Sequence, residues 1–424
     1  MFILNNEKTE HGLEENMKKT ELRKYAKLIA TMGANVQKGQ DVLIFAELDQ
    51  PEFVRILVDE CYRLRARRVD VIWTDQLIEK MHQKKRSLAT LSQVEAWEEA
   101  RWEYRASALP VHIYLESEDP DGMNGIDQVK DAKSRQARYK VIKPYRDRME
   151  NKYQWCIAAV PGAAWAKKLF PDLRTSAAIE KLWEAILYTS RAQGDPIENW
   201  KAHNADLDAR CAYLNSLDID KLEYKSANGT DLTVGLLEGT VFMGGAEPVQ
   251  GSGVMFNANI PSEEVFISPK RGVADGIVYA SKPLSYQGEL IEDFWIRFEG
   301  GRAVEVHAAR NEALLREMIS MDEGAAYLGE CALVPYESPI RQSGILFYNT
   351  LFDENAACHL ALGAGFTNTL KDYDKYTVKE CYQMGINESM IHVDFMIGTS
   401  DLSITAITRS GSRVPVFRDG TWAF

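Results

Sequence analysis

Asp41-Val42-Leu43-Ile44-Phe45-Ala46 is the stretch that decides the fold of the first half of the chain. A continuous apolar run of this length predicts a strand buried on both faces, as in a parallel sheet. Apolar residues recur at helical spacing from Leu22 to Val36, and Lys38-Gly39-Gln40 is expected to end that helix. A second helix over 53–61 and a second strand over 69–73 follow. This alternation predicts an α/β domain with a mostly parallel sheet.

The same order continues toward the middle of the chain. Strands are expected over 111–115 and 155–160, and helices over about 175–192 and 199–217. The region contains neither GxGxxG nor GxxxxGK[ST], so no phosphate-binding loop supports a nucleotide role.

Beyond residue 217 the sequence becomes typical of antiparallel strands. Strands over 222–225 and 231–234 flank a turn at Asn228-Gly229-Thr230, and 294–298 and 303–306 form a second hairpin. One helix is expected over about 311–319. The sequence therefore predicts a polar leader over 1–19, an N-terminal α/β domain over 20–217, and a β-rich α+β domain over 218–424.

Composition narrows the possible functions. The chain has 424 residues, 45% of them hydrophobic and 26% charged, which indicates a globular protein of two domains. A net charge of −12 argues against nucleic-acid binding. No apolar run is long enough for a membrane span, and the N-terminus does not resemble a secretory signal. The six cysteines form no CxxC, so we expect a cytoplasmic protein with reduced thiols.

Four segments of the second half place carboxylates or histidines among apolar or small residues. They are Asn259-Ile260-Pro261-Ser262-Glu263-Glu264-Val265-Phe266, the run around Glu330, the run from Leu351 to Gly363 that contains His359, and Ile391-His392-Val393-Asp394-Phe395-Met396. In the last of these, a strand points His392 and Asp394 to the same side. Polar groups on one face of an apolar strand need a partner when buried, and a metal ion suits both imidazole and carboxylate.

Each segment also has a purely structural explanation. Glu263 and Glu264 could stabilise a helix N-terminus, Glu330 could be a charge on an edge strand, and His359 could be a hydrogen-bonded core residue. His392 and Asp394 could be a hydrogen-bonded pair. Together, however, carboxylates and imidazoles without thiolates are the ligands of a two-metal site for zinc, manganese or cobalt.

These four motifs, in this order, resemble the aminopeptidase T/AmpS/PepS family of metallo-aminopeptidases from about Thr20 to the C-terminus. The resemblance implies an α/β N-terminal domain, a β-rich catalytic domain, a homodimer and peptide substrates. It implies two divalent metal ions per subunit (zinc, cobalt or manganese). The ligands it implies are Glu264, Glu330, His359, His392 and Asp394.

One position departs from the family. The family usually has a tyrosine seven residues after its first metal-binding histidine, thought to stabilise the oxyanion, and Phe366 stands there. Tyr373 and Tyr376 follow and are possible substitutes. Loss of such a donor lowers turnover by roughly 10²–10³-fold. A weakly active or non-catalytic dimeric homologue is therefore an alternative to the aminopeptidase, as is a two-metal hydrolase of another amide or ester.

Two further roles are expected from the residues. Glu263 is the candidate general base, because it neighbours a ligand and is not itself needed as one. Glu289 or Glu292 is the candidate partner for the free α-ammonium group of a peptide, with a solvated turn as the alternative explanation of that acidic segment.

Overall fold

The computed structural model describes residues 19–424, so the predicted polar leader lies outside the described residues except for Lys19. Residues 19–28 are helical, and the helix closes with a π-helical turn, η1 (Ile29–Gly33). The helix thus ends before Val36, earlier than the sequence predicted. Gly33 is packed so closely against Cys156 that an added Cβ would lie 2.6 Å from the Cys156 Sγ.

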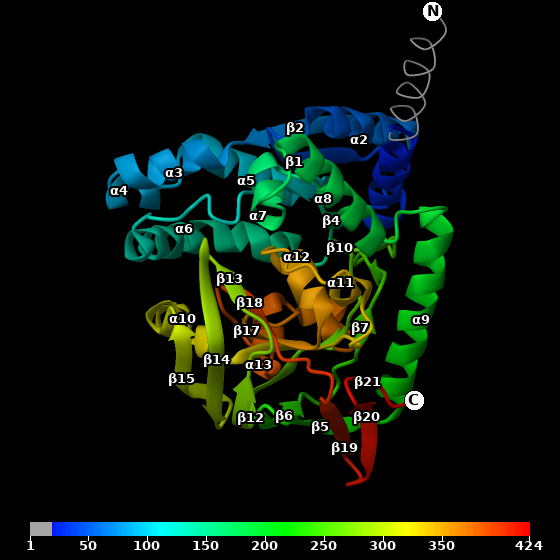
Figure 1. Cartoon of the computed structure of the whole chain (residues 1–424), viewed down its shortest axis with the longest axis vertical. Coiled ribbons are helices and arrows are strands. Elements are labelled where there is room, and N and C mark those ends of the chain that lie inside the picture. The colour runs from blue at the N-terminus through cyan, green and yellow to red at the C-terminus, as the bar shows by residue number, and fades with distance from the viewer. Residues whose placement is uncertain (1–18) are drawn as a thin grey trace, which may run out of the picture.

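A parallel sheet organises the first half (Figure 1). Its strands are β1 (Asp41–Glu47), β2 (Arg68–Thr74), β3 (Val111–Glu116) and β4 (Trp155–Ala159). They run in the order β10-β4-β3-β1-β2, and each neighbouring pair is parallel. β1 is buried along most of its length, as its apolar run predicts.

Helices connect and cover these strands. They are α2 (Pro51–Arg63), α3 (Gln76–Lys85), α4 (Leu88–Ser92), α5 (Ala96–Ala108), α6 (Gln128–Met149), α7 (Ala163–Leu169), α8 (Thr175–Thr189) and α9 (Pro196–Ser216). Asp195 caps the N-terminus of α9 and Pro196 occupies its first turn, where a missing N–H costs nothing. Figure 1 shows α9 running along one side of the molecule, from the parallel sheet toward the C-terminal strands.

Antiparallel strands dominate the second half. A large sheet runs in the order β13-β14-β12-β6-β5-β19-β20-β21, with β15 paired to β14. Its strands are β5 (Ile219–Lys225), β6 (Asp231–Leu236), β12 (Pro269–Tyr279), β13 (Leu284–Tyr286), β14 (Glu289–Glu299), β15 (Arg302–Arg310), β19 (Ser403–Thr408), β20 (Arg413–Arg418) and β21 (Thr421–Trp422). The predicted helix is α10 (Glu312–Met318).

A second antiparallel sheet carries the candidate ligands. Its order is β18-β17-β16-β11-β7, with β7 (Met243–Gly244), β11 (Val265–Ile267), β16 (Leu328–Leu333), β17 (His359–Gly363) and β18 (His392–Met396). A short ribbon pairs β8 (Glu247–Pro248) with β9 (Met255–Phe256). The helices α11 (Pro339–Gln342), α12 (Thr350–Asp353) and α13 (Val378–Met384), and the 3₁₀ turns η2 (Gly324–Ala326), η3 (Glu354–Ala356), η4 (Thr367–Thr369) and η5 (Tyr373–Lys375), fill the connections.

The two halves share strands and cores. β10 (Asn259–Ile260) belongs to the second half in sequence, yet it pairs with Ile157 and Ala158 of β4. Ile260 and Phe352 are buried in the core around the parallel sheet, while Leu214 is buried in the core of the second half. The boundary near residue 218 falls between α9 and β5 and stays a prediction.

The predicted fold class is confirmed: a parallel α/β region is joined to a β-rich region of antiparallel sheets. From residue 19 onward, none of the helices combines the length and the apolar character that a membrane crossing requires.

Candidate metal centre

Three neighbouring strands of the second sheet place the candidate ligands on one face. Opposed residues in an antiparallel pair point the same way. Glu330 of β16 lies opposite Ala361 of β17, and Ala361 lies opposite Asp394 of β18. His392 lies opposite Gly363, two residues further along β17, and His359 lies two residues back on the same face. Ala361 has only a methyl group and Gly363 has no side chain, which leaves room on this face for the longer polar groups to converge.

The side chains meet within contact distance. His392 Nε2 lies 3.1 Å from Glu330 Oε2 and 3.2 Å from Asp394 Oδ1. His359 Nε2 lies 3.0 Å from Glu264 Oε2, and Glu264 reaches the cluster from the loop before β11. Two groups of possible ligand atoms form, each spanning no more than 4.8 Å: Glu264, Glu330 and His359, and Glu330, His392 and Asp394. The structure thus brings together all five residues that the sequence named.

Both imidazoles are held in the orientation that a metal ligand needs. The Nδ1 atom of His359 lies 3.2 Å from the carbonyl oxygen of Ala357, and that of His392 lies 2.7 Å from the carbonyl oxygen of Ala364. A carbonyl only accepts, so each Nδ1 carries the proton and donates it. The lone pair of a neutral ring is then on Nε2, which faces the carboxylates.

The residues fit a metal ion for a second reason. His359 Nε2 and Asp394 Oδ1 are buried polar atoms without a hydrogen-bond partner among the described residues. His359 Nε2 lies at ion-pair distance from Glu264 Oε2, 3.0 Å, but the contact does not have the geometry of a hydrogen bond. Buried polar atoms are rarely left unpaired in this way. Imidazole nitrogen and carboxylate oxygen without thiolate suit zinc or another divalent transition metal.

Three of the four purely structural explanations do not account for this arrangement; only the pairing of His392 with Asp394, at 3.2 Å, is present in the structure, and there it is part of the larger cluster. Glu263 and Glu264 precede strand β11, not a helix. β16 lies between β17 and β11, so Glu330 is on an interior strand. His359 keeps one ring nitrogen unpaired, so it is not a fully hydrogen-bonded core histidine.

The charged groups of the cluster shift one another's pKa values. Burial raises the pKa of Glu330 to about 7, although His392 opposes that shift. Burial lowers the pKa of His359, but Glu264 and then the other carboxylates outweigh it and raise the value to about 9. Burial raises the pKa of Asp394, but His392 outweighs it and brings the value to about 2. The pocket therefore favours positive charge, as a cation site should.

Glu354 is a member of this cluster that the sequence reasoning missed. It is buried, and its pKa is raised well above the ordinary value by burial first and then by Asp394, Glu264 and Glu330. It also hydrogen-bonds Asp394, and its Oε1 accepts from Asn355 Nδ2 at 3.2 Å. A signal was present, since Glu354 is a charged residue between Phe352 and Ala356, both of which are buried.

Glu263 points to a different partner. Its Oε2 lies 2.5 Å from Arg191 Nη2, and its Oε1 is buried without a partner. Burial raises its pKa to about 7, against the opposing effect of Arg191. Glu289 and Glu292 are engaged elsewhere: Glu289 accepts from Asn311 at 3.3 Å, and Glu292 lies 3.6 Å from Arg310.

Phe366 lies beside the cluster. Its ring centroid is 4.9 Å from that of His392 and 5.2 Å from that of Phe266. The charged neighbours of Tyr373 are Glu247 and Asp374, and Tyr376 is exposed. Neither tyrosine therefore occupies the place beside His392 that Phe366 takes.

Comparison with known proteins agrees with this geometry. Residues 18–422 match the family described as Thermophilic metalloprotease (M29). The chain is 41% identical to aminopeptidase AmpS of Bacillus subtilis over 95% of this chain and 98% of that one. It is 37% identical to aminopeptidase T of Thermus aquaticus, with the same coverage of both chains.

A solved structure of an aminopeptidase also matches the whole fold. Wild-type AmpT from Thermus thermophilus superposes with a TM-score of 0.85 at 36% identity, covering 96% of this chain and all of that one. The resemblance stated from the four motifs is confirmed. The chain belongs to the thermophilic metalloprotease family and is an enzyme of the peptidase class.

Proposed function

We propose that the chain is a metal-dependent aminopeptidase that removes N-terminal residues from peptides at a centre for two divalent ions. The observation that carries the proposal is the convergence of two Nε2-facing imidazoles and the carboxylates around Glu330 in one buried cluster. The names of the relatives, which are aminopeptidases, support the exopeptidase assignment.

The ligand set divides into two groups with one shared member. Glu264, Glu330 and His359 would hold one ion, and Glu330, His392 and Asp394 the other. Zinc, cobalt and manganese all suit these ligands. Held by these residues, two such ions would supply a water of lowered pKa and a Lewis acid for the scissile carbonyl. We assign Glu354 as a further carboxylate ligand, because it contacts Asp394 and interacts with both groups.

Glu263 is the proposed general base. Arg191 binds one of its oxygens, while Oε1 is buried without a partner, and Glu263 directly precedes the ligand Glu264; Oε1 would be the atom that takes the proton. A pKa of about 7 suits a group that must accept this proton and then release it to the leaving amine near neutral pH.

The activity is tested with leucine p-nitroanilide and with unblocked and N-acetylated peptides. Hydrolysis that requires a free N-terminus, stops with chelator and returns with added metal is the expected result. Faster hydrolysis of p-nitrophenyl phosphate would instead identify a two-metal esterase. A chain that holds no metal and whose stability is unaffected by His392→Ala would be a non-catalytic homologue.

The chain is also proposed to be a cytoplasmic homodimer. All six cysteines are free and buried, which suits a reducing compartment. Exposed apolar side chains along α3, α4 and α5 offer a surface for self-association: Leu77, Ile78, Met81, Leu88 and Trp97. Sedimentation of the purified chain tests the dimer.

A further inference from the structure

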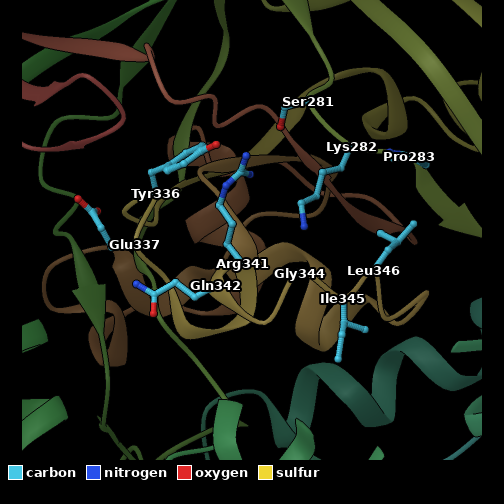
Figure 2. A pocket seen from close by; sticks show the side chains of 10 residues that line it. All are labelled: Ser281, Lys282, Pro283, Tyr336, Glu337, Arg341, Gln342, Gly344, Ile345 and Leu346. Carbon is cyan, nitrogen blue, oxygen red and sulfur yellow. The ribbon is translucent and has the colours of Figure 1, made fainter. Parts of the chain in front are cut away.

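A cavity of about 600 Å³ lies in the second half of the chain, apart from the ligand cluster itself (Figure 2). It is lined by two segments: Ser281–Pro283 between β12 and β13, and residues on and around α11. The two cations among its lining residues are Lys282 and Arg341. Figure 2 shows both side chains extending into the space between these segments.

Neither Lys282 nor Arg341 forms an ion pair with a carboxylate in the part of the chain from residue 19 on. The Arg341 guanidinium lies 3.7 Å from the centroid of the Tyr336 ring, a cation–π contact that orients it without removing its charge. Glu337 also lines the cavity, but it is exposed, and Figure 2 shows it pointing away from the two cations.

The carboxylate of Asp353, whose charge favours the protonated form of Lys282, already has other partners. Asp353 accepts hydrogen bonds from the backbone N–H groups of Phe347 at 2.9 Å and Asn349 at 3.1 Å. Burial lowers the pKa of Lys282, Asp353 raises it, and Arg341 lowers it again. Two half-buried cations that repel each other are stabilised by an anion placed between them.

Two chain segments connect this cavity to the metal centre. Asp353, which faces Lys282, directly precedes Glu354 of the ligand cluster. The backbone N–H of Ser281 donates to the carbonyl of Met396 at 2.8 Å, two residues beyond Asp394 on β18. Along β18, Met396 lies about 7 Å from Asp394, so the segment that carries Ser281 and Lys282 is bonded to the chain about two strand residues from the ligand cluster.

We propose that Lys282 and Arg341 bind the C-terminal carboxylate of a short peptide whose N-terminal bond lies at the metal centre. This inference rests on the proposed aminopeptidase function and adds its substrate class: peptides of about two to four residues. Recognition of both ends would set a length limit, because a longer chain cannot bring its carboxylate to the two cations while its first peptide bond is at the centre.

The test compares Leu-Gly-Gly with its C-terminal amide, using the wild-type enzyme, Lys282→Met and Arg341→Met. We expect kcat/KM to be about 10- to 100-fold higher for the free acid, mostly through KM, as for a lost charge-assisted hydrogen bond. Each substitution should abolish the difference between acid and amide. Lys379→Met and Arg418→Met, which remove exposed cations elsewhere, should preserve it.

Further substrates distinguish a failure of the carboxylate-binding proposal from a failure of the aminopeptidase function. Leucine p-nitroanilide has no carboxylate, so the enzyme and all four variants should hydrolyse it at similar rates. Hydrolysis of the anilide with equal rates for acid and amide would overturn the proposal while leaving the aminopeptidase function intact. A preference for Leu-Glu amide over Leu-Gln amide, without one for the free acid, would also overturn it, since the cations would then select acidic side chains.

A binding measurement decides the question even if no peptide is cleaved. The leaving product Gly-Gly should bind the wild-type chain about 10-fold more tightly than glycylglycinamide in calorimetry, and Arg341→Lys should retain part of the difference. Equal binding of the two compounds would contradict the assignment.

Discussion

His392 Nε2 lies 3.1 Å from Glu330 Oε2, and Glu330 is the member that both groups of candidate ligands within residues 19–424 share. A carboxylate between two ions can bind both, so its removal should affect both sites. For the proposed two-ion centre, Glu330→Gln should therefore lower metal content from two ions per chain to fewer than one. The loss of affinity should exceed the roughly 100-fold that follows removal of an outer hydrogen-bond partner. Elemental analysis of dialysed protein measures it, with Glu305→Gln, a surface change, as the control.

Metal binding should compete with protons, and the sign follows from the pKa shifts. In the metal-free chain, His359 has a pKa of about 9 against 6.5 when unfolded, and Glu330 about 7 against 4.5. Both values are raised, so the folded state holds extra protons, and their stabilising effect is lost as pH rises from about 4.5 to 9. The melting temperature should fall over this window in chelator. With metal it should fall less, because the ion replaces the protons. If the difference in melting temperature between the protein with metal and the protein in chelator narrowed with rising pH, the prediction would be contradicted.

Much of the fold follows from local sequence, and the exceptions have a common cause. The continuous apolar run at Val42–Ala46 predicts a strand buried on both faces, and the alternation at Phe294–Phe298 predicts a strand buried on one face. β10 could not be predicted: two residues give no periodicity, and their pairing with Ile157 and Ala158 spans about a hundred residues of chain. The sequence predicts too long a first helix, because the helix ends at Gly33 and the close packing of Gly33 against Cys156 is a tertiary contact that no local pattern reveals.

In the candidate site too, some residues follow from a local sequence pattern and others only from the tertiary structure. His392 and Asp394 were predictable as a pair because a strand places alternate residues on one face, and the structure brings them 3.2 Å apart. Glu354 was missed because a 3₁₀ turn, with no two-residue alternation, points it at Asp394. The role of Ala361 was equally hidden, since only the pairing of three strands puts it between Glu330 and Asp394.

Ala361 should be essential although it offers no ligand. Its side chain lies between those of Glu330 and Asp394 on the same face, so Ala361→Leu should fill the space between them and abolish metal binding. Val393 provides the matched control. It points to the other face and packs against the core, so Val393→Ala should lower the free energy of unfolding by about 1 kcal/mol and leave metal content unchanged. Calorimetry and metal analysis of both variants check the pair. Normal metal content in Ala361→Leu would contradict the geometry.

Phe366→Tyr should increase turnover. The Phe366 ring lies 4.9 Å from that of His392, so an added hydroxyl would be close to the ligand cluster. One donor to a developing oxyanion is worth about 10²–10³-fold in kcat. A gain in kcat on leucine p-nitroanilide with little change in KM is the expected result. No gain would mean that another group already supplies this hydrogen bond, and Tyr373→Phe and Tyr376→Phe would then show whether either tyrosine does.

Glu263→Gln and Glu354→Gln should separate proton transfer from metal binding. Glu263 has Arg191 as its partner and a free Oε1, whereas Glu354 hydrogen-bonds Asp394 within the ligand cluster. Glu263→Gln should keep both ions, lose about 10²–10⁴-fold in kcat, and lose the acidic limb near pH 7 in the pH profile of kcat/KM. Glu354→Gln should lose metal affinity instead, and excess metal should restore part of its activity. If Glu263→Gln retains full turnover with its acidic limb intact, the general base is another group. The Arg191–Glu263 pair would then serve only to hold α8 and α9 against the loop that carries Glu264.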